Sequence, residues 1–169
     1  YAQPGSQKAP ATDLVLHEHG AENDFMAFYI EPDGSLTVID RQTGATYSGL
    51  HHFEDVDDAG DEYSYCPSPT SETVSSAGEA AQVELVYFVP TMAQYRVTQT
   101  LQVPASLTDD RQKRTRERVP LPITSTLTLY AGQPGLYIET HVDNRAKDHK
   151  LTVTFDTDLT PDRAYVDAA

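Results

Sequence analysis

The chain has 169 residues, enough for one domain of ordinary size, and 38% of them are hydrophobic. A formal net charge of −14 argues against nucleic acid or an anionic membrane surface as the main partner, because both require a positive face. No apolar run reaches the ~18 residues of a membrane span, and the single cysteine, Cys66, suits a reducing compartment, so we expect a cytoplasmic protein without internal disulfides.

The beginning of the chain is rich in residues that favour flexible backbone. Residues 1–12 include Pro4, Gly5 and Pro10, and we predict a flexible lead-in followed by a single β-sandwich domain over 13–169. The chain starts at Tyr1 without a signal pattern, and we expect it to be a fragment of a longer protein.

Most of the remaining sequence is typical of short strands separated by turns. Apolar runs and alternating apolar and polar residues predict strands over 14–16, 25–31, 36–39, 45–50, 83–89, 95–103, 123–129, 136–142 and 151–155. The most apolar of these, 83–89, is predicted to be a central strand. Turn signals such as Pro32-Asp33-Gly34 separate them. No helical pattern of convincing length is present, so we predict an all-β, antiparallel β-sandwich.

Three polar segments interrupt the strands. Residues 54–67 begin with six acidic side chains in nine positions, and we interpret them as a loop whose carboxylates shape and solvate a turn. Residues 68–81 are rich in Ser, Thr, Glu and Ala and are predicted to be an exposed loop. Residues 105–118 carry five basic side chains; an anion site is conceivable, but a solvated connection between strands is favoured.

The clustered carboxylates and histidines are candidates for a metal site or a catalytic pair. An EF-hand loop starting at Asp55 would have Ala59 and Cys66 where two oxygen ligands are required, so only an irregular Ca²⁺ site remains as an alternative. Paired carboxylates between 54 and 62 could also act as a glycosidase acid and base, but the sequence does not fix their separation. His17 and His19 share a face if they lie on a strand, yet no further zinc ligand completes the pair.

The acidic segment also carries a longer motif. Residues 53–67 read FEDVDDAGDEYSYCP and resemble the Phe-Glu-Asp-x-x-Asp-x-Gly-Asp-Glu-Tyr-x-Tyr-x-Pro signature of bacterial α-mannosidases of glycoside hydrolase family 38. Residues 23–44 are similar to the first hairpins of that family. Residues 143–151 are similar to its Asp-Asn-x-x-x-Asp-His-Arg-Leu segment, with Lys150 in place of Arg. The resemblance runs in order over residues 23–159.

The resemblance implies a zinc-dependent, retaining α-mannosidase whose nucleophile and zinc ligands lie in a preceding α/β catalytic domain. This fragment is then expected to hold no catalytic residue and no metal or other cofactor, the zinc belonging to the missing domain. It is expected to form part of a galactose-mutarotase-like supersandwich. That region packs on the catalytic domain of the same chain and adds to the wall of the mannoside cleft.

Within the motif, the resemblance singles out one tyrosine. Eukaryotic relatives carry Ser-Gly-Ala-Tyr-Leu-Phe-x-Pro at this place, and the Tyr that reaches the sugar matches Tyr63. A Tyr suits sugar recognition because its ring covers C–H faces while its hydroxyl forms hydrogen bonds. We predict Tyr63, Asp61, Glu62 and Tyr65 as substrate-binding residues, although Asp61 and Glu62 do not match the eukaryotic motif.

Three other interpretations remain open. Tyr63 could be a core aromatic at a strand end, with Tyr65 on the same face. The whole chain could be an independent carbohydrate- or protein-binding β-sandwich module, calcium-loaded through the acidic stretch, or a small complete glycosidase using the 54–62 carboxylates.

Overall fold

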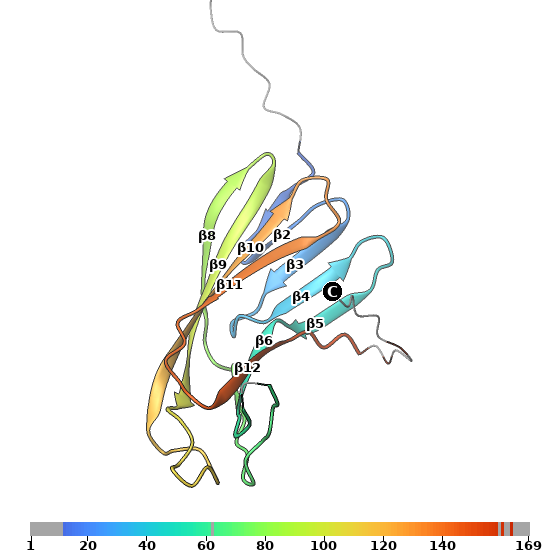
Figure 1. Cartoon of the computed structure of the whole chain (residues 1–169). Helices are drawn as coiled ribbons and strands as arrows, with labels where there is room; N and C mark the ends of the chain where they lie inside the picture. Colours follow the sequence, from blue (N-terminus) through green and yellow to red (C-terminus); the bar gives the residue numbers. More distant parts are fainter. Residues whose placement is uncertain (1–11, 62, 159, 161–162, 164–169) are drawn as a thin grey trace, which may run out of the picture.

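The computed structural model describes residues 12–61, 63–158, 160 and 163, which form three antiparallel sheets and no helix (Figure 1). The predicted all-β, antiparallel sandwich is therefore confirmed. The strands are β1 (Val15–His17), β2 (Gly20–Glu22), β3 (Met26–Ile30), β4 (Leu36–Asp40), β5 (Thr46–Leu50), β6 (His52–Asp57), β7 (Val74–Ser75), β8 (Gln82–Val89), β9 (Met92–Pro104), β10 (Arg118–Tyr130), β11 (Leu136–Val142) and β12 (His149–Thr154). Most of the predicted lead-in lies outside the described residues. None of the described segments is an apolar helix of membrane-spanning length.

The longest hairpin, β9–β10, forms one layer that packs against both other sheets. It belongs to the sheet with order β11-β10-β9-β8 and packs against both other sheets, one with order β1-β2-β3-β4-β5 and one with order β12-β6-β7. In Figure 1 the other two sheets lie on the same side of the hairpin, one beyond the other along its length. Each strand of the hairpin has 13 residues, which is enough length to cover two sheets in succession.

Two hydrophobic cores follow from this arrangement. Alternate residues of β9 and β10 point inward, since successive side chains of a strand lie on opposite faces. Toward the open end of the hairpin, Tyr95, Val97 and Leu127 pack against Phe28 and the rest of the first sheet. Toward its connecting loop, residues of the same two faces pack against the third sheet in a second core formed by Phe53, Leu101, Val103, Leu121 and Ile123.

A polar junction separates the two cores. Here the chain leaves β5 for β6 through His51, which has a positive φ of 63°. His51 is buried, its Nε2 lies 3.3 Å from Oγ of Ser125, and its ring packs edge-on against Phe53. Burial lowers the pKa of His51, which favours the neutral ring. The left-handed backbone at this residue is the point at which the chain passes from the first sheet to the third.

Three differences from the sequence-based prediction concern two strands and the polar segments. The predicted central strand β8 lies at the edge of its sheet, where Leu85, Tyr87 and Phe88 stay about half exposed because none of the described residues covers that edge. Strand β2 was not predicted because its Gly-Ala-Glu sequence has low β-propensity. A Cβ atom on Gly20 would lie 2.1 Å from the carbonyl oxygen of Phe28, so only glycine allows this close pairing with β3.

The third difference concerns the polar segments. The first four residues of the predicted acidic loop, 54–57, belong to strand β6, in which Asp55 and Asp57 are fully buried. The predicted exposed loop 68–81 contains strand β7 and the buried side chains of Ser68 and Ser76. Carboxylates are normally exposed, so the acidic segment is expected to face solvent. Ion pairs and hydrogen bonds described below reverse that preference.

Tyr95 provides a test of the larger core. Its ring is 1% exposed, and its hydroxyl lies 2.7 Å from the carbonyl oxygen of Gly20 and 3.0 Å from that of His17, while burial raises the pKa of the phenol. Tyr95→Phe should lower the free energy of unfolding by about 1–2 kcal/mol, because two carbonyl groups lose their buried donor. Urea unfolding measures this loss. Tyr87→Phe, at the half-exposed edge, is the control, and equal losses in both variants would contradict the assignment.

Candidate functional site

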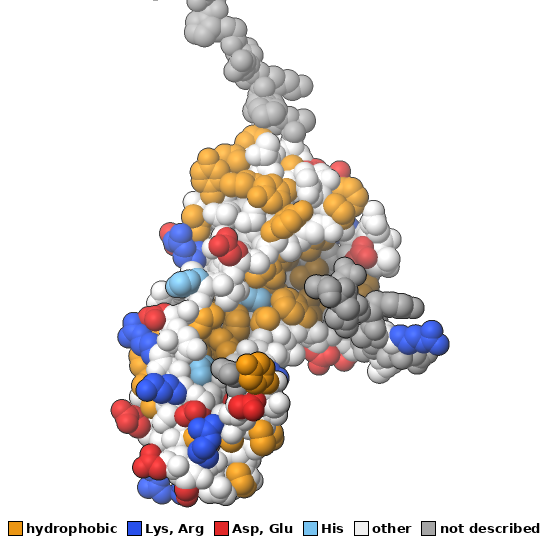
Figure 2. All heavy atoms as spheres, in the orientation of Figure 1, with side chains coloured by type: hydrophobic (Ala, Val, Ile, Leu, Met, Phe, Trp, Pro, Cys, Tyr) orange, Lys and Arg blue, Asp and Glu red, His pale blue; other side chains and the backbone are white. Residues whose placement is uncertain are grey.

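Three connecting segments meet at one end of the molecule, drawn at the bottom of Figure 1. They are residues 58–73 after β6, residues 105–117 between β9 and β10, and residues 143–148 before β12. The backbone N–H of Asp58 donates to the carbonyl of Asp148 at 2.9 Å, and that of Lys147 donates to Ala105 at the same distance. Side chains of both charge signs cover this end (Figure 2). Backbone and side-chain contacts therefore make the three segments one structural unit.

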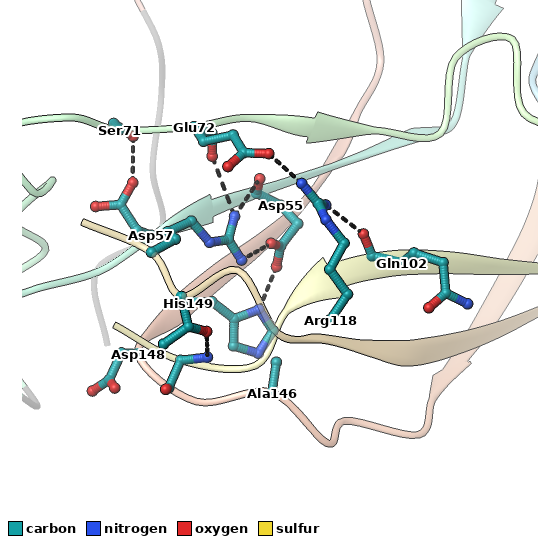
Figure 3. Close-up of polar contacts among 12 residues, drawn as sticks. Asp55, Asp57, Ser71, Glu72, Gln102, Arg118, Ala146, Asp148 and His149 are labelled. Atoms are coloured by element: carbon teal, nitrogen blue, oxygen red, sulfur yellow. Dashed lines mark hydrogen bonds and ion pairs between the residues drawn. The ribbon is translucent and has the colours of Figure 1, made fainter. Parts of the chain in front are cut away.

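The centre of this unit is the buried carboxylate of Asp55. One of its oxygens pairs with the guanidinium of Arg114, whose side chain is only 2% exposed. The same guanidinium donates to the carbonyl oxygens of Asp55 at 3.3 Å and Glu72 at 3.2 Å. The other oxygen of Asp55 contacts Nδ1 of His149 (Figure 3). A buried charge requires such partners, because removal from water otherwise costs several kcal/mol.

His149 connects this centre to the third segment. Its Nε2 lies 3.0 Å from Oδ1 of Asn144, and that oxygen also accepts the backbone N–H of Ala146 at 3.1 Å. His149 opens β12 directly opposite Asp57 of β6. The histidine is therefore fixed on both sides of its ring.

Asp57 holds the far end of the 58–73 segment. Its carboxylate accepts the backbone N–H of Ser68 and the hydroxyl of Ser71, each at 2.5 Å. Burial by itself would raise the pKa of Asp57, but the hydrogen bonds from Ser71 and Ser68 outweigh it and lower the pKa from 3.8 to about 2. The carboxylate thus stays ionised and ties the end of the loop to β6.

Between these anchors, hydrogen bonds define the backbone of residues 58–61 and 63–67, which belong to one loop. Asp58 Oδ1 accepts the N–H groups of Gly60 at 2.9 Å and Cys66 at 3.0 Å, and the N–H of Ala59 donates to the Cys66 carbonyl at 2.6 Å. A Cβ on Gly60 would lie 1.7 Å from the carbonyl oxygen of Ser64, so this turn requires glycine.

The predicted site residues lie on this loop. Tyr63 is 87% exposed, which excludes its interpretation as a core aromatic in this chain. Asp61 does not extend freely outward, since its Oδ1 accepts the backbone N–H groups of Tyr63 at 3.0 Å and Ser64 at 2.8 Å. Tyr65 is half exposed, with the Lys150 ammonium 4.6 Å from its ring centroid. Glu62 lies outside the described residues.

Three consecutive residues support the loop from behind. Asp148 accepts Asp58 N–H, and its carboxylate receives Arg111, which also donates to the Gly60 carbonyl at 3.4 Å. His149 contacts Asp55, and Lys150 lies over Tyr65. The Lys in place of the usual Arg keeps a cation–π contact with the ring. The Asp-His-Lys sequence thus holds the loop that presents Tyr63.

These contacts bear on the other chemistries considered from the sequence. Asp55 and Asp57 are each occupied by cationic or hydrogen-bonding partners, so neither is free to act as a glycosidase acid or base in this arrangement. His17 pairs with Glu22 at 3.3 Å. Among residues 12–61, 63–158, 160 and 163, no group of three or more His, Cys, Asp or Glu side chains could hold a metal ion.

The 105–118 connection is mostly exposed, as expected, but it is more than a solvated link between strands. Arg114 is buried on Asp55, Arg111 pairs with Asp148, and Arg118 pairs with Glu72. Sequence reasoning missed Asp55, Arg114 and His149 as a group. One signal was available for Asp55: it follows Phe53 by two positions, so on a strand both side chains share the inward face. No spacing rule could have indicated Arg114, 59 residues away.

The buried ion pair gives a prediction for stability. Arg114→Met should lower the free energy of unfolding by about 3–5 kcal/mol, because it leaves a buried carboxylate with one partner fewer. Arg145→Met removes an equally direct but exposed pair with Asp143 and should change stability little. Denaturant titration of both variants checks this, and comparable losses would show that burial of Asp55 is not the deciding factor.

Asp57 gives a prediction for acid stability. Its lowered pKa stabilises the fold above the unfolded value of 3.8, and this contribution is lost as the pH falls through about 2. At ~1.4 kcal/mol per pH unit it is worth about 2 kcal/mol at neutral pH. The stability difference between wild type and Asp57→Asn should therefore shrink from pH 5 to pH 2. Urea unfolding of both proteins over this pH range measures the difference, and a difference that does not change with pH would contradict the assignment.

Comparisons with known proteins agree on one family. Residues 21–168 match the glycosyl hydrolases family 38 C-terminal domain. A Halalkalibacterium halodurans protein with the provisional name mannosylglycerate hydrolase is 30% identical over 162 residues, covering 87% of this chain and 18% of that protein. An α-mannosidase from Enterococcus faecalis V583 superimposes with a TM-score of 0.86 at 29% identity, over 92% of this chain and 19% of the enzyme.

A second Enterococcus faecalis structure, of a protein in glycosyl hydrolase family 38, has a TM-score of 0.81 at 28% identity over 87% of this chain and 20% of its own. The chain thus spans about a fifth of the length of these relatives. The family match covers well over half of the chain and follows the resemblance expected from the motifs. The chain belongs to the glycosyl hydrolase family 38 C-terminal domain family.

Proposed function

We propose that this chain is an accessory β-domain of a zinc-dependent, retaining α-mannosidase, and that it packs on the catalytic domain and lends the loop 58–67 to the mannoside cleft. The observation that carries the proposal is the placement of Tyr63. A large ring that is 87% exposed adds little to this domain's own stability. Its backbone is nevertheless held by an Asx turn, within a loop braced by three consecutive residues. Such a side chain suits a ligand-binding site that is completed by another domain.

Catalysis is assigned to that other domain. The buried carboxylates of this chain are engaged in internal contacts, and the described residues do not fit a zinc site. Zinc, expected from the family resemblance, is therefore proposed for the catalytic domain only. The half-exposed apolar side chains of Leu85, Phe88 and Phe155 support packing against further protein.

The assignment of catalysis to another domain is tested by measuring hydrolysis of an aryl α-mannoside. The 169-residue chain alone should show no turnover, whereas the full-length gene product that contains it should hydrolyse the substrate. Zinc-dependent turnover by the isolated chain would overturn the proposal.

Tyr63 gives a kinetic prediction in the full-length protein. Tyr63→Phe should lower kcat/KM about tenfold, the equivalent of one hydrogen bond to a sugar hydroxyl, and Tyr63→Ala should lower it further through loss of the ring contact. Tyr87→Phe, also exposed but on β8, should leave kcat/KM unchanged. Steady-state kinetics with matched unfolding curves separates a lost contact from lost folding; unchanged kinetics in both Tyr63 variants would remove Tyr63 from the cleft.

A second candidate is an independent carbohydrate-binding module. A hollow of about 560 Å³ on the outer face of β10 and β11 is lined by Tyr130, Tyr137 and Gln94, a combination of rings and amides that suits sugars. Binding of mannose oligosaccharides by the isolated chain, abolished by Tyr137→Ala, would favour this candidate. Thermal stabilisation by Ca²⁺, reversed by EDTA, would indicate its calcium-loaded form.

A further inference from the structure

Strand β8 has one unpaired edge and large apolar side chains on both of its faces. Among the described residues it pairs with β9 alone, at one side of the four-stranded sheet (Figure 1). Leu85 lies opposite Tyr95, whose ring is in the core, so Leu85 also lies on the core face. Phe88 lies opposite buried Ala93 on the same face, whereas Tyr87 lies on the outer face. Leu85, Tyr87 and Phe88 nevertheless stay about half exposed.

The other edge of the same sheet, β11, has the pattern of a strand that faces solvent. Its core-face residues Leu136 and Ile138 pack against the larger core, and most of its exposed side chains are polar. On β8, Val83 packs against that core, but Leu85 and Phe88 remain accessible to water. One edge of the sheet therefore suits solvent, and the other suits contact with further protein.

Strand β8 also lacks most of the features that protect a free edge. Proteins protect such edges with lysine, proline or inward-pointing charges, because unpaired backbone groups pair readily with other chains. The sequence QVELVYFV contains none of these, and its one charge, Glu84, pairs with Arg96 at 3.0 Å. A bulge at Val86 is its one protective feature, and apolar side chains lie on either side of it. Exposed segments of this composition aggregate, so we expect the edge to be covered in the native protein.

The chemistry of this edge indicates a β-strand as its partner. Alternate N–H and C=O groups of an edge strand point away from its one neighbour, and another strand satisfies them most completely. Apolar side chains on both faces of β8 are typical of a strand within a sheet that is covered on both sides. The added strand is therefore expected to be apolar on both faces as well.

We propose that β8 is an internal strand of the full-length protein, paired along its free edge with a β-strand from the polypeptide outside these 169 residues. The chain spans about a fifth of the length of its relatives, which leaves ample polypeptide to supply that strand. A second copy of the chain is disfavoured, because each copy has a net charge of −14 and the two would repel. The proposal rests on the part of the proposed function that makes the chain one domain of a longer enzyme. It does not depend on the role of Tyr63.

Hydrogen exchange followed by mass spectrometry compares the isolated chain with the full-length gene product. In the monomeric 169-residue chain, the β8 amides that do not bond to β9 should exchange rapidly. In the full-length protein, peptides covering 82–89 should exchange at least about tenfold more slowly, because the added strand protects these amides. Strand β9, which has a neighbour on each side in either protein, reports the change in general stability.

The proposal requires a gain in protection for β8 that exceeds the change in β9. A gain no larger than that of β9 would reflect general stability and would overturn it. Protection of β8 already present in the isolated chain would also overturn it. If that protection rises with protein concentration, the edge belongs to a second copy of the chain instead.

Leu85→Lys tests whether the added strand covers the core face of β8. In the isolated chain this position is half exposed, so the midpoint of urea unfolding should change little. In the full-length protein the ammonium would lie beside the added strand, and exchange of residues 82–89 should accelerate toward the rate in the isolated chain. Gln42→Lys, in the exposed turn between β4 and β5, is the control and should leave this exchange unchanged. Unchanged exchange in full-length Leu85→Lys would contradict the proposal.

The paired edge and the proposed function can fail separately. If β8 gains protection in the full-length protein while both Tyr63 variants keep wild-type kcat/KM, the paired edge stands and the role of the loop in the cleft is refuted. If Tyr63→Phe is impaired while β8 exchanges equally in both proteins, the proposed function stands and the paired edge is refuted.

Discussion

The burial of the Asp55 carboxylate is the constraint on which this end of the molecule depends. A carboxylate with no access to water must be compensated by charge and hydrogen bonds. The compensating groups come from Arg114, 59 residues away, and His149, 94 residues away. Because both side chains contact Asp55, the connecting segments beside them lie next to the one that follows β6. One buried charge therefore holds together three loops that are far apart in the sequence.

The position of that charge is set by the long β9–β10 hairpin. The hairpin lies under two sheets in succession, and the second of these, formed by β12, β6 and β7, faces the part of the hairpin nearest the 105–117 connection. Arg114 lies in that connection and so reaches Asp55 on β6. Phe53 and Leu151 of the third sheet pack against apolar side chains of the hairpin. The apolar core thus places the sheet, and the ion pairs then place the loops.

The 58–67 loop combines a backbone held by hydrogen bonds with an exposed aromatic side chain. Backbone hydrogen bonds, two Asx turns and an obligatory glycine define its course, whereas Tyr63 extends into solvent. A fixed backbone with an exposed aromatic tip reduces the entropy lost when a ligand binds. This is the physical basis for proposing that the loop completes a sugar site on another domain of a family 38 enzyme.

The sequence by itself determined the β class, most strand positions and the family, because alternation, turn residues and a contiguous motif are local signals. It could not determine that Asp55 and Asp57 are buried, that 83–89 forms an edge strand, or that Arg114 and His149 share one carboxylate. These facts depend on which segments meet in space. Only the tertiary structure decided them, since the free energy that buries a carboxylate comes from partners 59 and 94 residues distant rather than from its neighbours in the chain.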